Sequence, residues 1–167
     1  MTSISPKIKP VVALEVDNAN ASKRSWLSRL KLDHFRNYQQ ADLAIHAGQL
    51  VILGDNGAGK TNLLEAVSLL APGRGMRRAK TEHLAYRASG FDTSCGIADN
   101  DDADRLDWAV AATLENEDGT VQIGTGVPPS AKQGSRIMRL EGVTVSQANV
   151  GSRLAVSWLT PQMDGIF

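Results

Sequence analysis

The sequence predicts an α/β fold with a mixed β-sheet and antiparallel hairpins, and three patterns lead to this prediction. Apolar and polar residues alternate over residues 26–34 and again over 41–45, as they do in strands with one buried face. The continuous apolar run at 50–53 is typical of a strand buried on both faces. Residues 59–71 then have the spacing of an amphipathic helix, which Pro72-Gly73 ends.

The first two strands are expected to pair as an antiparallel hairpin, because only the short segment 35–38 separates the start of one from the end of the other. Within the predicted helix, one face should be apolar and should pack on the sheet. The residues assigned to this stripe are Leu63, Leu64, Val67, Leu70 and Ala71, with Asn62, Glu65 and Ser68 placed elsewhere.

Two more strand pairs are predicted in the second half of the chain. Residues 106–114 have Leu106, Trp108, Val110 and Ala112 on one face, and Asn116-Glu117-Asp118-Gly119 turns the chain into a strand at 121–123. Alternation resumes over residues 136–145 around Glu141-Gly142. The prediction is therefore a series of hairpins flanking one strand–loop–helix unit.

Composition limits the class of protein. The chain has 167 residues, of which 42% are hydrophobic, so one globular domain is expected. Its net charge is zero, and contact with nucleic acid would therefore need a local basic patch. The single cysteine, Cys95, excludes an internal disulfide and suits a reducing compartment. Because no apolar run is long enough to span a membrane, we expect a cytoplasmic protein.

The domain boundary is expected near Trp26. Residues 1–25 are rich in Ser, Thr, Pro, Asn and Lys and hold no period for long, which predicts a flexible N-terminal tail. Residues 26–167 are predicted to form the folded lobe.

One motif carries chemistry, and it lies between the apolar run and the predicted helix. It matches G-x-x-x-x-G-K-[ST], the phosphate-binding P-loop, and the strand before it and the helix after it are the context that the motif requires. Its residues are Gly54, Asp55, Asn56, Gly57, Ala58, Gly59, Lys60 and Thr61.

Each residue type in the motif has a physical role. Glycines permit backbone angles that bring successive N–H groups close to a phosphate, and the helix N-terminus adds partial positive charge. Lys60 would hold the β- and γ-phosphates, and the Thr61 hydroxyl would bind Mg²⁺. We therefore predict a nucleoside triphosphate and Mg²⁺ as ligands. The alternative is a glycine-rich turn without a ligand.

Several stretches resemble the RecF family of bacterial recombination and repair ATPases and, more broadly, the ABC-type heads of the SMC and Rad50 class. The likeness runs from about residue 27 to 167. The segments that carry it are Leu32-Asp33-His34-Phe35-Arg36-Asn37-Tyr38, the P-loop itself, Asn62-Leu63-Leu64-Glu65-Ala66, Pro72-Gly73-Arg74-Gly75-Met76-Arg77-Arg78-Ala79 and Trp158-Leu159-Thr160-Pro161-Gln162-Met163-Asp164.

The resemblance implies a P-loop NTPase fold, here the N-terminal lobe of an ABC-ATPase-like head. It implies a head that dimerises around ATP, binds single-stranded or gapped DNA, and works with recombination-mediator proteins in recombinase loading and the SOS response. By resemblance, Arg36 and Asn37 would line the ATP site, or else form only a hairpin turn. Gln162 would contact the metal and the attacking water, or else be an ordinary loop residue.

A basic cluster follows the predicted helix. It consists of Arg74, Arg77, Arg78 and Lys80, and it could contact DNA phosphates or simply suit the negative end of the helix dipole. The acidic run at 99–104 lacks the Gly and Asn/Asp positions of a calcium loop, and the three histidines lack ligand spacing. No metal site other than that of Thr61 is therefore expected.

The sequence also departs from the family pattern. After Thr61, no stretch reads as a signature motif or as a Walker B strand ending in Asp-Glu. We therefore expect an incomplete head that lacks its C-terminal half, so that ATPase activity is uncertain. The alternative function is a truncated, hydrolysis-incompetent module that binds a nucleotide or a partner. A small P-loop kinase is disfavoured by the hairpin that precedes the motif.

Overall fold

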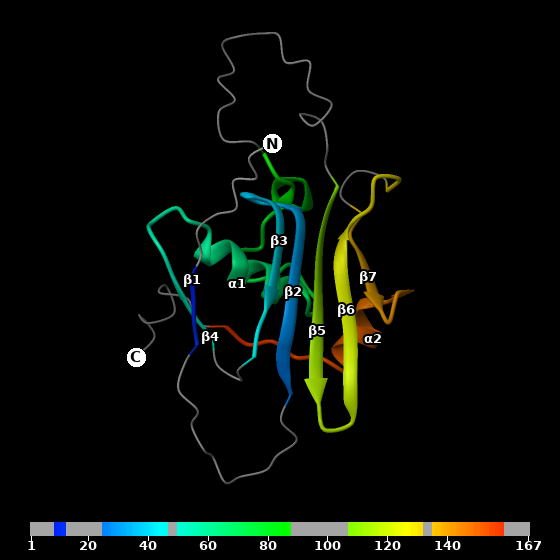
Figure 1. Ribbon diagram of the computed structural model, residues 1–167. Helices are drawn as coiled ribbons and strands as arrows, with labels where there is room; N and C mark the ends of the chain where they lie inside the picture. The colour runs from blue at the N-terminus through cyan, green and yellow to red at the C-terminus, as the bar shows by residue number, and fades with distance from the viewer. Residues whose placement is uncertain (1–8, 13–24, 47–49, 88–106, 132–134, 159–167) are drawn as a thin grey trace, which may run out of the picture.

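The structure, a computed structural model, describes residues 9–12, 25–46, 50–87, 107–131 and 135–158 (Figure 1). Its strands are β1 (Lys9–Val12), β2 (Trp26–Phe35), β3 (Tyr38–Ala44), β4 (Leu50–Leu53), β5 (Trp108–Asn116), β6 (Gly119–Val127), β7 (Ile137–Leu140) and β8 (Val143–Val145). Its α-helices are α1 (Lys60–Leu69) and α2 (Gln147–Gly151), and one 3-10 turn spans Thr81–Leu84.

Six strands form one sheet in the order β3-β2-β5-β6-β7-β8, and β1 pairs with β4 in a separate two-stranded sheet. The predicted α/β class is confirmed. All pairings within the described ranges are antiparallel, whereas the sequence predicted a mixed sheet. The difference arises at 50–53, where the apolar run predicted a strand buried on both faces of a sheet.

The three predicted hairpins are confirmed. In the first, Leu30 lies opposite Leu43. The turn between β5 and β6 is tightened where the Asp118 amide donates to the Asn116 side-chain oxygen at 2.9 Å. Between β7 and β8, Glu141 and Gly142 both have positive φ, of 50° and 77°, which is the geometry of a two-residue hairpin turn.

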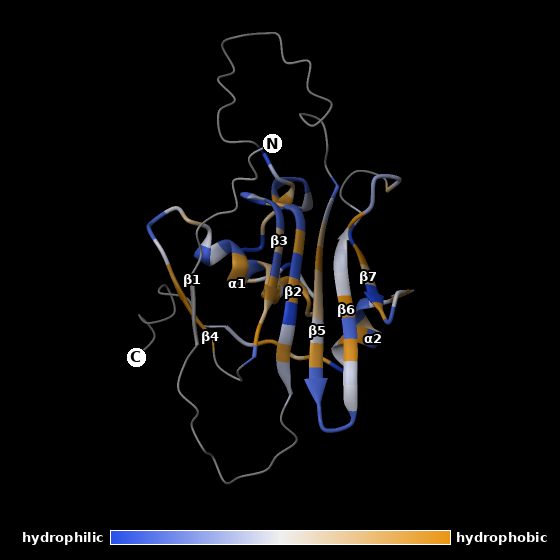
Figure 2. Ribbon diagram, viewed as in Figure 1, coloured by the Kyte–Doolittle hydropathy of each residue, from blue (hydrophilic) through white to orange (hydrophobic). Residues whose placement is uncertain are grey.

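The core lies on one face of the six-stranded sheet. Alternating residues of its strands point into the core and are covered by α1 and α2, which lie on the same side of the sheet (Figure 1). Hydropathy colouring shows the corresponding alternation along β2 (Figure 2). The buried sheet residues include Leu30, Leu32, Trp108, Val110, Ala112, Ile123 and Met138.

The prediction that residues 50–53 are buried on both faces is wrong. They form a strand, but Leu50, Val51 and Leu53 are 40–52% exposed. The reason is the pairing: β4 hydrogen-bonds only to β1 among the described residues and is not inside the large sheet. β1 itself is a correction to the predicted tail, since residues 9–12 gain regular structure by pairing with β4. The rest of residues 1–24 lies outside the described ranges.

Helix α1 is rotated relative to the predicted stripe. Leu64, assigned to the apolar face, is 53% exposed, whereas Glu65 and Ser68, assigned elsewhere, are buried with Leu63 and Ala66. The buried face is therefore shifted by about one residue. Glu65 and Ser68 can be buried on this face because both polar side chains have hydrogen-bond partners. Neither described helix is long and apolar enough to cross a membrane.

Candidate nucleotide-binding site

The P-loop occupies the connection between β4 and α1, as predicted. Gly57 and Gly59 have φ angles of 85° and 101°, in the left-handed region that glycine adopts at little cost. Gly59 is also the N-cap of α1 and has no side chain to occupy the helix N-terminus. The loop is therefore shaped as an open turn of backbone that leads directly into the positive end of a helix.

Lys60 folds back over this turn. Its ammonium Nζ donates to the carbonyl oxygens of Gly54, at 2.7 Å, and Asp55, at 2.8 Å. These two contacts fix the cation above the loop, at the position where it would meet phosphate oxygens. The ammonium has a third donor hydrogen, and its side chain is only partly buried.

The first amides of α1 are available for an anion. Those of Asn62 and Leu63 donate to the Gly59 carbonyl oxygen, at 2.8 and 3.1 Å, whereas the amides of Lys60 and Thr61 have no acceptor within the helix. Thr61 is exposed beside them, so its hydroxyl is accessible to a metal ion. Backbone donors, a cation and a hydroxyl are thus brought together as a triphosphate and Mg²⁺ require, and these residues fit both ligands.

The β2–β3 hairpin packs against the P-loop. A Cβ atom added at Gly59 would lie 2.6 Å from both the Asn37 Nδ2 and the Tyr38 hydroxyl oxygen, so glycine is needed there for contact. Tyr38 is buried, and its hydroxyl has no hydrogen-bond partner among the described residues. Desolvation by burial raises the pKa of Tyr38 to about 12. The hairpin turn therefore packs directly against the P-loop backbone.

A buried carboxylate joins α1 to this hairpin. Glu65 is 1% exposed, and its two oxygens accept hydrogen bonds from the Arg36 Nε and Nη2 at 2.9 and 2.7 Å. The remaining Arg36 nitrogen, Nη1, donates to the carbonyl oxygen of His83 at 2.9 Å. Arg77 Nη1 also lies 3.3 Å from Glu65. The sequence did not identify Glu65 as part of the site, because its partners are distant in the chain.

Side-chain amides continue this network to the P-loop. Arg77 Nη1 donates to the Asn62 Oδ1 at 2.9 Å, and the Asn62 Nδ2 donates to the Asn37 Oδ1 at 2.8 Å. Asn37 in turn donates to the carbonyl oxygen of Ala58 at 3.5 Å. The hairpin, the helix and the segment after the helix are therefore connected to one P-loop carbonyl.

The structure brings some of the predicted site residues to the P-loop and not others. Asn37 contacts the P-loop backbone, whereas the Arg36 guanidinium is held by Glu65 and His83, and nucleotide contact by either remains a prediction. Gln162 lies outside the described residues, as do Cys95 and the acidic run at 99–104. Within the described residues, no group of His, Cys, Asp and Glu side chains could hold a metal ion.

The arginines of the basic cluster after α1 differ in their exposure and contacts. Arg74 and Arg78 are exposed. Arg77 is instead held at one nitrogen by Asn62 and Glu65, although 42% of its side chain remains accessible. DNA contact by these three residues stays a prediction, and the geometry favours Arg74 and Arg78 over Arg77.

Comparison with known proteins agrees with the motif and fold. The family model for the RecF/RecN/SMC N-terminal domain matches residues 26–162. The chain is 45% identical over 142 residues to the DNA replication and repair protein RecF of Rhizobium johnstonii, with 84% of this chain and 34% of the relative covered. It is 44% identical over 145 residues to the RecF of Agrobacterium fabrum, with the same coverage. The chain thus spans about a third of the length of these relatives.

Solved structures share the fold. A structure of the recombination mediator protein RecF-ATP in the RecFOR pathway superposes with a TM-score of 0.62 at 21% identity, covering 87% of this chain and 35% of that one. The SMC head domain from Thermotoga maritima gives a TM-score of 0.50 at 15% identity, covering 78% of this chain and 42% of that one. The chain belongs to the RecF/RecN/SMC N-terminal domain family, and the relatives that it matches in sequence are RecF proteins.

Proposed function

We propose that this chain is the ATP-binding lobe of a RecF-like DNA replication and repair protein. The observation that carries the proposal is the P-loop geometry, in which the Lys60 ammonium lies over a left-handed glycine turn at the N-terminus of α1. An anion at that position would meet a full charge, two free amides and the helix dipole together. The relative whose structure carries ATP has the same fold, which supports ATP as the nucleotide.

Each residue has a defined task in this proposal. The amides of residues 57–61 bind and orient the phosphates, and Lys60 neutralises their charge after exchanging its carbonyl partners for phosphate oxygens. The Thr61 hydroxyl would hold Mg²⁺, which would supply positive charge to stabilise the phosphates. Asn37, between the Ala58 carbonyl and Asn62, positions the loop. Gln162 is proposed to approach the metal and the attacking water.

DNA and protein partners are the finer part of the proposal. The names of the relatives support a role in DNA replication and repair and a RecFOR-type pathway. We assign gapped or single-stranded DNA binding to Arg74 and Arg78, with Arg77 joining them through its exposed surface. ATP-dependent homodimerisation, cooperation with recombination mediators, recombinase loading, the SOS response and a cytoplasmic location complete the proposed role.

A second function is favoured by one observation. Leu50, Val51 and Leu53 expose apolar surface on β4, next to the P-loop. Such a surface is typical of a region that another chain or segment covers. The chain could therefore act as a hydrolysis-incompetent module that binds a nucleotide or a partner through this strand.

Calorimetric titration with MgATP tests the proposed site. We expect binding to the wild-type chain and a loss of at least tenfold in affinity for Lys60→Ala. Lys31→Ala, which removes an exposed lysine from the solvent face of β2, is the matched control and should bind as the wild type does. If Lys60→Ala bound MgATP with unchanged affinity, the P-loop assignment would be wrong.

A turnover assay separates the two functions. The purified 167-residue chain should release little phosphate from ATP, because the sequence shows no Walker B or signature residues to activate water and stabilise the transition state. Hydrolysis that depends on Lys60 would instead show that the chain carries all the groups that the reaction needs.

A further inference from the structure

A cationic cavity lies at the opposite end of α1 from the P-loop. It encloses about 360 Å³ and is lined in part by Arg74, Lys80 and Arg136. Leu69 at the end of α1 forms one wall, nine residues beyond Lys60, so the cavity is about 14 Å along the helix axis from the P-loop. None of the described residues that line it is acidic.

Arg136 is the residue that sets this cavity apart. It immediately precedes β7, and its Nη2 atom is buried without a hydrogen-bond partner among the described residues. A guanidinium carries five donors and stays charged, so a buried nitrogen without an acceptor is energetically unfavourable. Desolvation by burial lowers the pKa of Arg136. An anion in the adjoining cavity would remove this cost.

The walls are held in place by hydrogen bonds that do not involve the cationic groups. The Gln147 Oε1 accepts from the Gly73 amide at 3.1 Å, which ties α2 to the segment that carries Arg74. The Met76 amide donates to the Ser68 hydroxyl at 2.9 Å, and Trp108 Nε1 donates to the Thr81 carbonyl oxygen at 3.1 Å. Because Gln147 uses only its oxygen, its amide N–H groups can still donate into the cavity.

Lys80 has one competing partner, and it is weak. Its Nζ lies 3.9 Å from a Glu82 carboxylate oxygen, with 71% of the Lys80 side chain exposed. Exposed pairs at that distance contribute little and exchange readily. The Lys80 ammonium can therefore turn toward the cavity.

We propose that this cavity is a phosphate-binding site, separate from the nucleotide site, in which Arg136 is the anchor and Arg74 and Lys80 complete the charge. Guanidinium groups bind phosphate oxygens through paired hydrogen bonds, and the cavity is of the size that proteins use for small ligands. The phosphate comes either from a nucleic-acid backbone or from a free phosphate ion, since both present the same oxygens.

Thermal unfolding of the full chain in sodium phosphate, against sodium chloride at equal ionic strength, tests the site. A Lys60→Ala background removes the contribution of the P-loop. Phosphate should raise the melting temperature of this variant, and adding Arg136→Gln should abolish that rise, with phosphate affinity at least tenfold weaker. Adding Arg153→Gln instead makes the same charge change at an exposed arginine outside the cavity and should preserve the rise.

The test does not depend on whether the Arg136→Gln variant folds. In chloride, Arg136→Gln should not lower the melting temperature, because it removes an unpartnered buried donor. If it does unfold the chain, the paired exposed changes Arg74→Gln and Lys80→Gln should weaken phosphate binding severalfold in a folded protein. An equal phosphate response in Arg136→Gln and Arg153→Gln would overturn the proposal, as would no response to phosphate in the Lys60→Ala background.

A short DNA duplex, followed by fluorescence anisotropy at several salt concentrations, distinguishes the two sources. If the source is nucleic acid, Arg136→Gln weakens DNA binding and reduces the salt dependence by about one counterion. If only the response to inorganic phosphate changes, the source is the free ion, and the site is still confirmed. MgATP binding by Arg136→Gln should equal that of the wild type, so failure of this inference is distinguishable from failure of the proposed nucleotide site.

Discussion

At the scale of single residues, Glu65 determines how the helix and the hairpin meet. It is buried, and Arg36 binds both of its oxygens while Arg77 approaches one of them. A carboxylate taken from water in this way is tolerated only with such partners. The two arginines therefore explain why a charged residue can occupy the buried face of α1.

Replacing Glu65 by Gln should destabilise the fold markedly. The change removes the charged partner of Arg36, whose side chain is about four-fifths buried, so we expect a loss of about 2–4 kcal/mol in the free energy of unfolding. Urea denaturation measures it. Asp42→Asn, which breaks the exposed pair with Arg29, is the control and should change stability by less than about 1 kcal/mol. Equal effects of the two changes would contradict the role of Glu65.

Tyr38 gives a prediction for the pH dependence of stability. Burial raises its pKa from 10.0 to about 12, so the unfolded chain loses this proton first as the pH rises. The associated stability is complete below pH 10 and is lost progressively between about pH 10 and pH 12. Tyr38→Phe should be as stable as the wild type at pH 7, because the hydroxyl has no partner among the described residues. The stability of Tyr38→Phe should also decline less steeply than that of the wild type at alkaline pH. A decline as steep as that of the wild type would exclude Tyr38 as its source.

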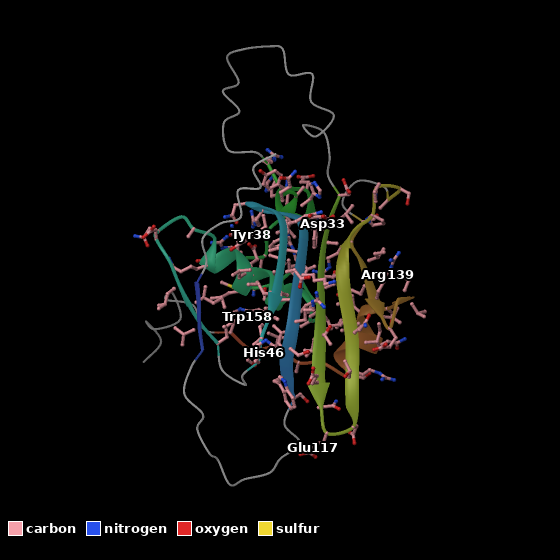
Figure 3. The ribbon with its side chains drawn as sticks, viewed as in Figure 1. Asp33, Tyr38, His46, Glu117, Arg139 and Trp158 are labelled. Atoms are coloured by element: carbon pink, nitrogen blue, oxygen red, sulfur yellow. The ribbon has the colours of Figure 1, made fainter. Side chains whose placement is uncertain are left out.

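At the scale of elements, the P-loop depends on the hairpin beneath it. Asn37 and Tyr38 come from the β2–β3 turn and fill the space against which Gly59 packs. Figure 3 labels Tyr38 beside α1 and Arg139 on β7, toward the other edge of the sheet. The candidate nucleotide site therefore lies at the β3 edge, and the proposed phosphate cavity lies toward β7 and α2.

Gly59→Ala should destabilise the protein more than Gly57→Ala does. Both changes force a side chain into the left-handed region, at about 1–2 kcal/mol each. At Gly57 a Cβ would have no atom within 4 Å, whereas at Gly59 it would overlap Asn37 and Tyr38. The difference between the two in urea denaturation isolates the contact with the hairpin. If the two variants were equally stable, the hairpin would not support the loop.

The sequence predicted the positions of the strands and turns more accurately than the burial of the side chains. Alternation identified β2, β3 and β5, and turn residues such as Asn116 and Gly142 identified the hairpins, because these signals are local. The burial of Glu65 and the exposure of Leu64 were missed, since the phase of α1 depends on Arg36 from a distant strand. The P-loop was found because its chemistry lies in consecutive residues, whereas the cavity around Arg136 joins three separate segments.

At the scale of the whole molecule, apolar surface is distributed unevenly. The six-stranded sheet buries its apolar face under α1 and α2, whereas β4 exposes Leu50, Val51 and Leu53 together. Contiguous apolar residues on an exposed strand favour association with another chain or segment.

We expect the isolated 167-residue chain to self-associate as its concentration increases, through β4. Leu53→Lys should shift sedimentation toward the monomer, because it places a charge within the exposed apolar strand. Val143→Lys, at a 65% exposed position on β8, makes the same change elsewhere and should leave association unaltered. Equal effects of both substitutions would show that β4 is not the contact.

The proposed function requires that the backbone between β4 and α1 binds phosphate groups of a nucleotide. Amide chemical-shift mapping of the labelled chain during titration with MgADP tests it most directly. We expect the largest shifts at the amides of residues 57–61, with smaller ones at Asn37 and Asn62, which contact the loop and each other. Unchanged amides at 57–61 under saturating nucleotide, or shifts concentrated elsewhere in the chain, would contradict it.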